Sequence, residues 1–146
     1  HSCHIEAQRG FGTATADYLL QENNKIFLTA TDDSHFRMQD FGGGWVMVAA
    51  DNLSEISILN ALKNGQYYSS TGVEIFEFQI NNRKITIRCS PANQVCIVGQ
   101  GAKSMSQNGK NITNAEFDLI DYPSDWFRVS IANDSGKFAW TNPIWF

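Results

Sequence analysis

Residues 74–89, EIFEFQINNRKITIRC, contain the clearest structural signal in this chain. Apolar and polar residues alternate along 76–80 and again along 84–89, and two asparagines, Asn81 and Asn82, lie between these runs. Successive side chains of a strand point to opposite faces, so a period of two is typical of half-buried strands. Asparagines between two such runs are typical of a tight turn. The segment therefore predicts an antiparallel hairpin.

The same pattern continues toward the C-terminus. Short runs of strand-forming residues are separated by turn sequences such as Asn108-Gly109. The further predicted strands are residues 94–98, 115–120, 126–132 and 137–140. With the hairpin these make six short strands, which favour an antiparallel β-sandwich for residues 73–146.

Before residue 73 the pattern changes, because helix and strand signals alternate. The expected elements are a helix at residues 14–22, buried strands at 25–31 and 45–50, and a second helix from Asn52 to just before Gly65. Asn52 and Glu55 have the spacing of a helix capping box. The chain is therefore predicted to be α+β, with one domain at residues 1–72 and another at 73–146.

Composition and charge exclude several classes of partner. The 146 residues carry 15 acidic and 11 basic side chains, which gives a formal net charge of −4. No basic cluster is interleaved with aromatic residues, so we expect no nucleic-acid partner. No apolar run reaches the length of a membrane span, so we expect no membrane partner either.

The cysteine content favours a cytoplasmic protein. Three cysteines, Cys3, Cys89 and Cys96, are an odd and sparse set, and no secretory signal is visible. Reduced thiols in the cytoplasm are the expectation. A disulfide between Cys89 and Cys96 stays possible, because the turn-like stretch between them would make them neighbours on two strands.

Asp33 and His35 are the leading candidates for chemistry. They follow the predicted strand at 25–31, and residues two apart on an extended segment face the same side. A carboxylate and an imidazole can bind one divalent metal ion, and this pair suits zinc, manganese or iron alike. Asp32 would face the other way and could orient His35 or a neighbouring loop.

Two other histidines, His1 and His4, have helical spacing and could share a metal ion. A flexible terminus is the simpler reading of this pair. A weaker alternative is an independent site with one metal ion, held by Asp33, His35 and one of His1 or His4. That site would require the N-terminus to fold back onto the loop.

An ordered set of motifs resembles a known family. The motifs are residues 29–35 (TATDDSH), 44–45 (GW), 53–54 (LS), 61–72 (ALKNGQYYSSTG), 88–92 (RCSPA) and 136–144 (GKFAWTNPI). Together they resemble the PHP (polymerase and histidinol phosphatase) family of metal-dependent phosphoesterase-like hydrolases. The likeness is strongest to a bacterial subgroup with an added C-terminal β-domain.

The resemblance implies a distorted (β/α) barrel with a centre of two or three metal ions. The last metal-binding motif of the family, Asp-x-His, maps onto Asp33 and His35. The family's first His-x-His pair and its middle ligands have no counterpart here. Residues 1–72 would then be the last βα units of the barrel, and residues 73–146 the accessory β-sandwich.

The expected function is therefore a fragment of a metal-dependent hydrolase of phosphate esters. The parent would be an enzyme, whereas the activity of this chain alone stays open because most ligands are missing. Its expected partner is the missing N-terminal barrel half or further copies of itself. The alternative is a non-catalytic β-sandwich module that recognises a ligand or packs on a catalytic domain.

Overall fold

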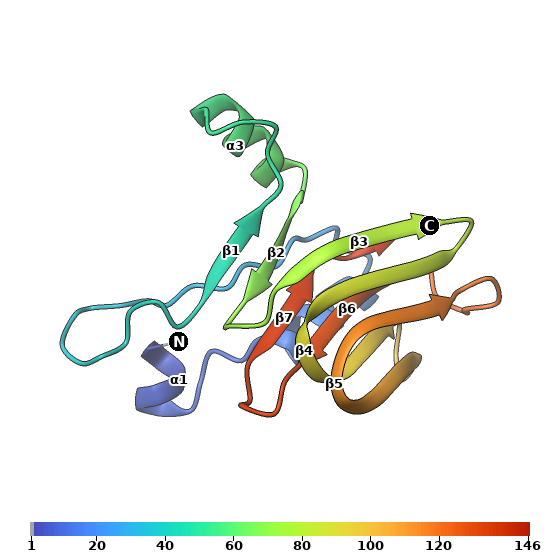
Figure 1. The fold of residues 1–146 in the computed structure, drawn as a ribbon. Coiled ribbons are helices and arrows are strands. Elements are labelled where there is room, and N and C mark those ends of the chain that lie inside the picture. Colours follow the sequence, from blue (N-terminus) through green and yellow to red (C-terminus); the bar gives the residue numbers. More distant parts are fainter. Residues whose placement is uncertain (1) are drawn as a thin grey trace.

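The structure, a computed structural model, describes residues 2–146. Within these residues the chain forms three helices and eight strands (Figure 1). The helices are α1 (Ser2–Ala7), α2 (Thr13–Gln21) and α3 (Glu55–Lys63). The strands are β1 (Trp45–Val48), β2 (Tyr67–Ser70), β3 (Ile75–Asn81), β4 (Lys84–Gly99), β5 (Ser104–Asp118), β6 (Trp126–Ala132), β7 (Phe138–Thr141) and β8 (Ile144–Trp145). The expected mixture of helices and antiparallel strands is confirmed.

Strand β4 organises the sheet because it pairs with three neighbours. β5 runs along one edge of β4, while β3 pairs with the first half of the other edge and β6 with the second half. The register of β4 against β5 shifts on both sides of Ala92, next to Pro91, which has no N–H to donate. The sheet curls at this irregularity into a half barrel (Figure 1).

Alternate residues of the long strands face one core. Ile85, Ile87 and Cys89 of β4 are buried, while the residues between them are exposed. The period of two in the sequence therefore reports burial on one face. The core cluster consists of Val73, Ile85, Ile87, Cys89, Ala92, Val95, Ile97, Ile112, Ala115, Phe117, Leu119, Tyr122, Phe127, Val129, Ile131 and Ala139.

The predicted barrel units before residue 72 are not observed in the described part of the chain. β1 and β2 pair antiparallel with each other, and β2 continues the sheet by pairing with β7. A parallel barrel requires parallel neighbouring strands joined by crossovers. The predicted sandwich is not confirmed either, because β1 to β8 belong to one sheet. The long strands β4 and β5 run through the curl of this sheet without interruption.

Residues 25–31 are extended but form no strand. Their backbone groups bond to side chains instead: Asn142 Oδ1 accepts from the Leu28 N–H at 2.7 Å, and Ser69 Oγ donates to the Leu28 carbonyl at 2.9 Å. The segment also passes close to Gly44, where a Cβ atom would lie 2.9 Å from the Thr31 carbonyl oxygen. The predicted strand is wrong, and at Leu28 two side chains satisfy the backbone groups that a sheet ladder would have paired.

Helix α2 is attached to the sheet by a buried ion pair. Arg128 of β6 donates from Nε and Nη2 to the two carboxylate oxygens of Asp17, each at 2.7 Å. The Arg128 side chain is only 4% exposed. The helix also buries the side chains of Ala16 and Leu20. Neither charged residue stands out in the sequence.

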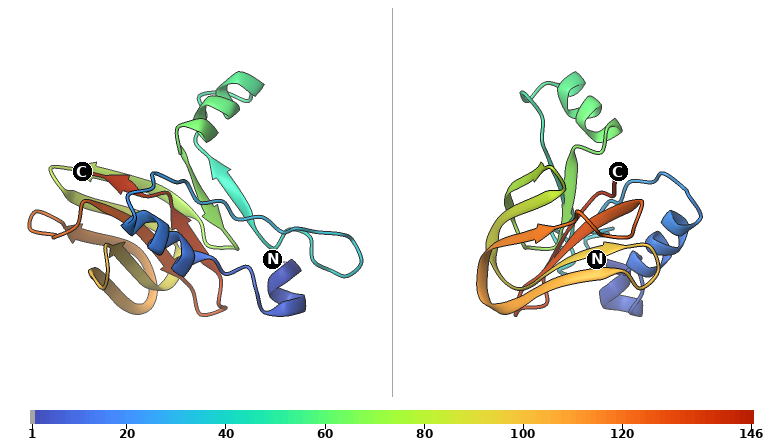
Figure 2. Two further views of the ribbon diagram at one scale, coloured as in Figure 1. Left: turned by 180° about the vertical axis from the view of Figure 1, so that it is seen from behind. Right: turned by 90° about the vertical axis from the view of Figure 1, so that its right-hand side faces the viewer.

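Helix α3 projects from the sheet at the end of the β1 and β2 arm (Figure 2). Its N-cap is Ser54, whose Oγ accepts from the Ser57 N–H at 3.3 Å, and not the predicted Asn52. Asn52 instead accepts from the Ser54 N–H, which positions the cap. Leu53, just before the helix, and Ile56 within it are 97% and 73% exposed, so apolar side chains are left uncovered here.

Cys89 and Cys96 are both free thiols on the same strand, β4. The stretch between them is part of this strand and not a turn, so they are not cross-strand neighbours and form no disulfide. Burial raises the pKa of both thiols. Among the described residues, no helix is both long enough and apolar enough to cross a membrane.

Candidate functional site

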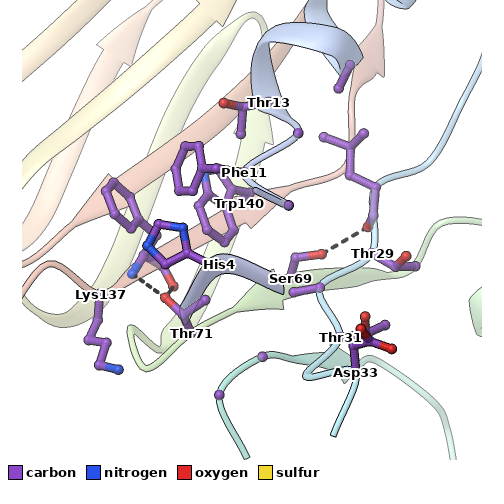
Figure 3. Close-up of a pocket in the computed structure, with 18 of the residues that line it drawn as sticks. His4, Phe11, Thr13, Thr29, Thr31, Asp33, Ser69, Thr71, Lys137 and Trp140 are labelled. Atoms are coloured by element: carbon purple, nitrogen blue, oxygen red, sulfur yellow. Dashed lines mark hydrogen bonds between the residues drawn. The ribbon is translucent and has the colours of Figure 1, made fainter. Parts of the chain in front are cut away.

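A cavity of about 790 Å³ opens between the N-terminal segment and the β2 and β7 region of the sheet (Figure 3). Its walls come from residues 10–13, from the extended residues 27–31, from Gly43 and Gly44, and from the turn that leads into β7. Asp33 and His4 also line it. The volume is within the range of small-molecule sites. Segments far apart in the sequence therefore meet at one place.

One wall of the cavity is aromatic. Phe138 and Trp140 of β7 stack with ring centroids 5.2 Å apart and an interplanar angle of 8°. Phe11 stands edge-on to both rings, at 5.4 Å and 5.6 Å. Phe11 is nevertheless 53% exposed. The wall thus presents exposed aromatic ring surface to the cavity.

Hydroxyl groups form another part of the lining, and two of them hold the backbone. Ser69 Oγ donates to the Leu28 carbonyl, which fixes the extended segment against β2. Thr71 Oγ1 accepts from the Phe138 N–H at 2.8 Å, which fixes the start of β7. Thr29 and Thr31 line the opposite side of the cavity. These polar groups set the position of the walls.

Asp33 lies at the edge of the cavity, in the left-handed backbone region with φ of +52°. His35 is exposed and does not line the cavity. Its Nδ1 atom lies 2.9 Å from the Asp33 carbonyl oxygen. The contact between the two predicted ligands is therefore a hydrogen bond between the His35 ring and the Asp33 backbone.

Two acidic residues brace the loop that carries this pair. Asp32 accepts from the Ser34 N–H at 3.4 Å and from the Gly42 N–H at 2.7 Å. Asp40 is only 1% exposed and accepts from the Ser34 hydroxyl at 2.7 Å and from the His35 N–H at 3.2 Å. Asp32 thus holds Ser34 and Gly42 of its own loop, and its expected role beside a metal ion stays a prediction. Sequence reasoning missed Asp40, since nothing in its neighbours signals burial.

The histidines near the N-terminus divide between described and undescribed residues. His4 is exposed and lines the cavity, as Asp33 does (Figure 3). His1 lies outside the described residues. Among the side chains that the structure describes, no three His, Cys, Asp or Glu residues gather in a way that would hold a metal ion.

Comparison with known proteins adds no further guide to this site. No protein-family model matches the chain, and no curated protein or solved structure matches it either.

Proposed function

We propose that this chain supplies Asp33 and His35 as two ligands of a divalent metal ion in a hydrolase of phosphate esters. The support is the resemblance of the motif around these residues to a metal-binding motif. Further support is their place on a braced loop beside a large cavity. Zinc, manganese and iron all accept a carboxylate and an imidazole.

The contact between His35 and the Asp33 backbone is the observation that carries this proposal. With its proton on Nδ1, the ring donates to the Asp33 carbonyl oxygen at 2.9 Å and keeps a lone pair on Nε2. Metal-binding histidines commonly donate their second N–H to a carbonyl or carboxylate oxygen, which fixes the tautomer and the ring orientation. Because His35 is exposed, a metal ion can reach Nε2.

Two ligands fit only part of a catalytic site, which commonly has three protein ligands and a water molecule. Since no third ligand gathers at this pair among the described side chains, we propose that the others come from another polypeptide segment. A bound metal ion would lower the pKa of a water molecule and polarise the ester. Asp32 and Asp40 hold the loop so that both ligands keep their positions.

The proposed partner is either the remaining part of a barrel or a second copy of this chain. Ile56 and Leu59 are exposed on the projecting α3, Leu53 is exposed just before it, and Met47 is exposed on β1. Exposed apolar side chains of this kind can be covered at an interface. Sedimentation at micromolar to millimolar concentration that finds only monomer would count against the second-copy form of this proposal.

The metal proposal is tested by titrating the chain with Zn²⁺ or Mn²⁺ while its melting temperature is followed. A metal ion that binds only the folded state stabilises it, by about 2.7 kcal/mol at a hundredfold excess over Kd. The Asp33→Ala, His35→Ala double variant is expected to lose this stabilisation. The matched control, His4→Ala, is expected to keep it.

Equal stabilisation of the parent and the double variant would remove Asp33 and His35 from the proposal. Loss of the stabilisation in His4→Ala as well would instead favour the site in which His4 joins this pair.

The second candidate function is ligand binding without catalysis, and the aromatic wall of the cavity favours it. Trp126 is buried, but Trp140 and Trp145 are only partly buried, and Trp140 faces the cavity. Partly covered aromatic side chains in a concave site are typical of small-molecule recognition.

A further inference from the structure

We propose that the cavity binds a small molecule with a flat ring system and one acidic group. This inference rests on the second proposed function, ligand binding, and is independent of metal binding at Asp33 and His35. Its basis is the distribution of aromatic and charged side chains around the cavity (Figure 3).

The ring system would lie against the aromatic wall. Phe11 is 53% exposed although it contacts both Phe138 and Trp140. The parallel stack of Phe138 on Trp140 presents ring surface beside the Phe11 edge. Flat rings bind such surfaces by offset stacking or edge contacts, which non-planar groups of equal volume cannot make. The wall therefore selects for planarity.

The acidic group would lie at the end of the cavity that holds Lys137 and His4. Figure 3 shows these two residues on the same side, beside Thr71. Within the described residues, neither side chain takes part in an ion pair. The Lys137 ammonium group and the His4 ring can both donate hydrogen bonds, so this end of the cavity suits an acidic group.

Local structure fixes the backbone of Lys137 at this end. Asn133 Oδ1 accepts from the Lys137 N–H at 2.9 Å, which closes the turn before β7. A Cβ atom at Gly72 would lie 3.2 Å from Lys137 Cγ, so the absence of a side chain there leaves room for the lysine stem. The stem lies on the cavity wall while its charge stays in water.

The opposite end of the cavity sets the orientation of the ligand. Asp33 and Thr31 lie there, away from Lys137 (Figure 3). The donor groups lie at the Lys137 end, so the acidic group is placed there. The ligand class is thus an aromatic acid.

The test measures binding of 2-naphthoate by calorimetry and by tryptophan fluorescence, with EDTA present to remove metal ions. Two comparison probes separate the features: naphthalene-2-methanol keeps the ring without the charge, and cyclohexanecarboxylate keeps the charge without the flat ring. We expect 2-naphthoate to bind more tightly than either.

Matched variants locate the binding site. Phe11→Ala is expected to weaken 2-naphthoate binding by about two- to tenfold. Its control, Phe76→Ala, removes a ring that is 52% exposed and lies outside the cavity, and should leave the affinity unchanged. Lys137→Gln is expected to weaken binding by about threefold, whereas Lys110→Gln, at an exposed lysine outside the cavity, should not. Unchanged melting temperatures confirm that the variants fold.

The outcomes distinguish a failure of the ligand-binding function from a failure of the acidic ligand class. If naphthalene-2-methanol binds as tightly as 2-naphthoate, the ligand-binding function stands and the acidic class is wrong. If no probe binds, or if Phe76→Ala weakens binding as much as Phe11→Ala, this cavity is not the site. Because EDTA is present throughout, these outcomes do not depend on whether Asp33 and His35 bind a metal ion.

Discussion

Asp40 is a buried carboxylate in a loop whose other residues are mostly exposed. It accepts from the Ser34 hydroxyl and from the His35 N–H, so it determines the path of the backbone on both sides of the predicted metal ligands. Asn142 has a comparable role, because its side chain bonds to the backbone of Leu28, Gly65 and Tyr67. Single polar side chains thus hold the segments around the cavity where no sheet ladder is present.

Replacing Asp40 by alanine is expected to lower the free energy of unfolding by about 1–3 kcal/mol, because two donors lose a charged acceptor. Urea denaturation measures the change. The control is Asp121→Ala, which removes an exposed carboxylate and is expected to change stability by less than about 0.5 kcal/mol. Equal effects of the two substitutions would show that Asp40 does not brace the loop.

At the scale of elements, the two longer helices differ in how they are attached. Helix α2 is joined to β6 by the pair of Asp17 and Arg128, and its Leu20 is buried. Helix α3 follows the sequence pattern for an amphipathic helix, yet it leaves Ile56 and Leu59 exposed. Amphipathicity therefore predicted both helices but not the surface against which each one packs.

Removing Asp17 is expected to destabilise the protein by about 3 kcal/mol, because the buried Arg128 guanidinium loses its partner. Chemical denaturation of Asp17→Ala tests this. The Asp17→Leu, Arg128→Met double variant should recover most of the loss, since no buried charge then remains. In the exposed pair of Lys84 and Asp118, Lys84→Ala should cost less than about 1 kcal/mol. A small effect of Asp17→Ala would mean that α2 is not attached through this ion pair.

For the whole molecule, the buried acids predict a loss of stability in alkali. Burial raises the pKa of Tyr68, Tyr122, Cys89 and Cys96 above their usual values, and for Cys96 the nearby Arg128 opposes this in part. The folded state therefore holds these protons more tightly than the unfolded state does. The resulting stability is fully present below the unfolded-state pKa and is lost as the pH rises through the folded-state pKa.

The urea midpoint is accordingly expected to stay level between about pH 7 and 8 and to fall above about pH 8.5, where unfolded thiols lose their protons. In the Cys89→Ala, Cys96→Ala variant the fall should begin only near about pH 10, where unfolded tyrosines titrate. A midpoint that rises with pH in the parent protein would contradict the assigned direction of these shifts.

Local pattern predicted the elements well where one face is buried. The hairpin at residues 74–89 is confirmed, although its turn centres on Asn82 and Arg83, which have φ of +48° and +64°, and not on Asn81 and Asn82. The predicted strand at 126–132 corresponds to β6. The predicted turn at Asn108-Gly109 is wrong, because β5 continues through it. Asn108 pairs with Gln94 of β4, and the register shift that follows at residues 109–111 is an irregularity within β5 and not a turn between two strands.

Periodicity predicted the hairpin, β6 and the two longer helices, because side-chain spacing is a property of neighbouring residues. The cavity depended on tertiary contacts, since Asn142 bonds to Leu28 across 114 positions of the chain and Phe11 meets Trp140. The same holds for the single curled sheet, in which β2 pairs with β7. Such pairings depend on which edges and side chains remain unsatisfied after the local elements form, and no short window of sequence contains that information.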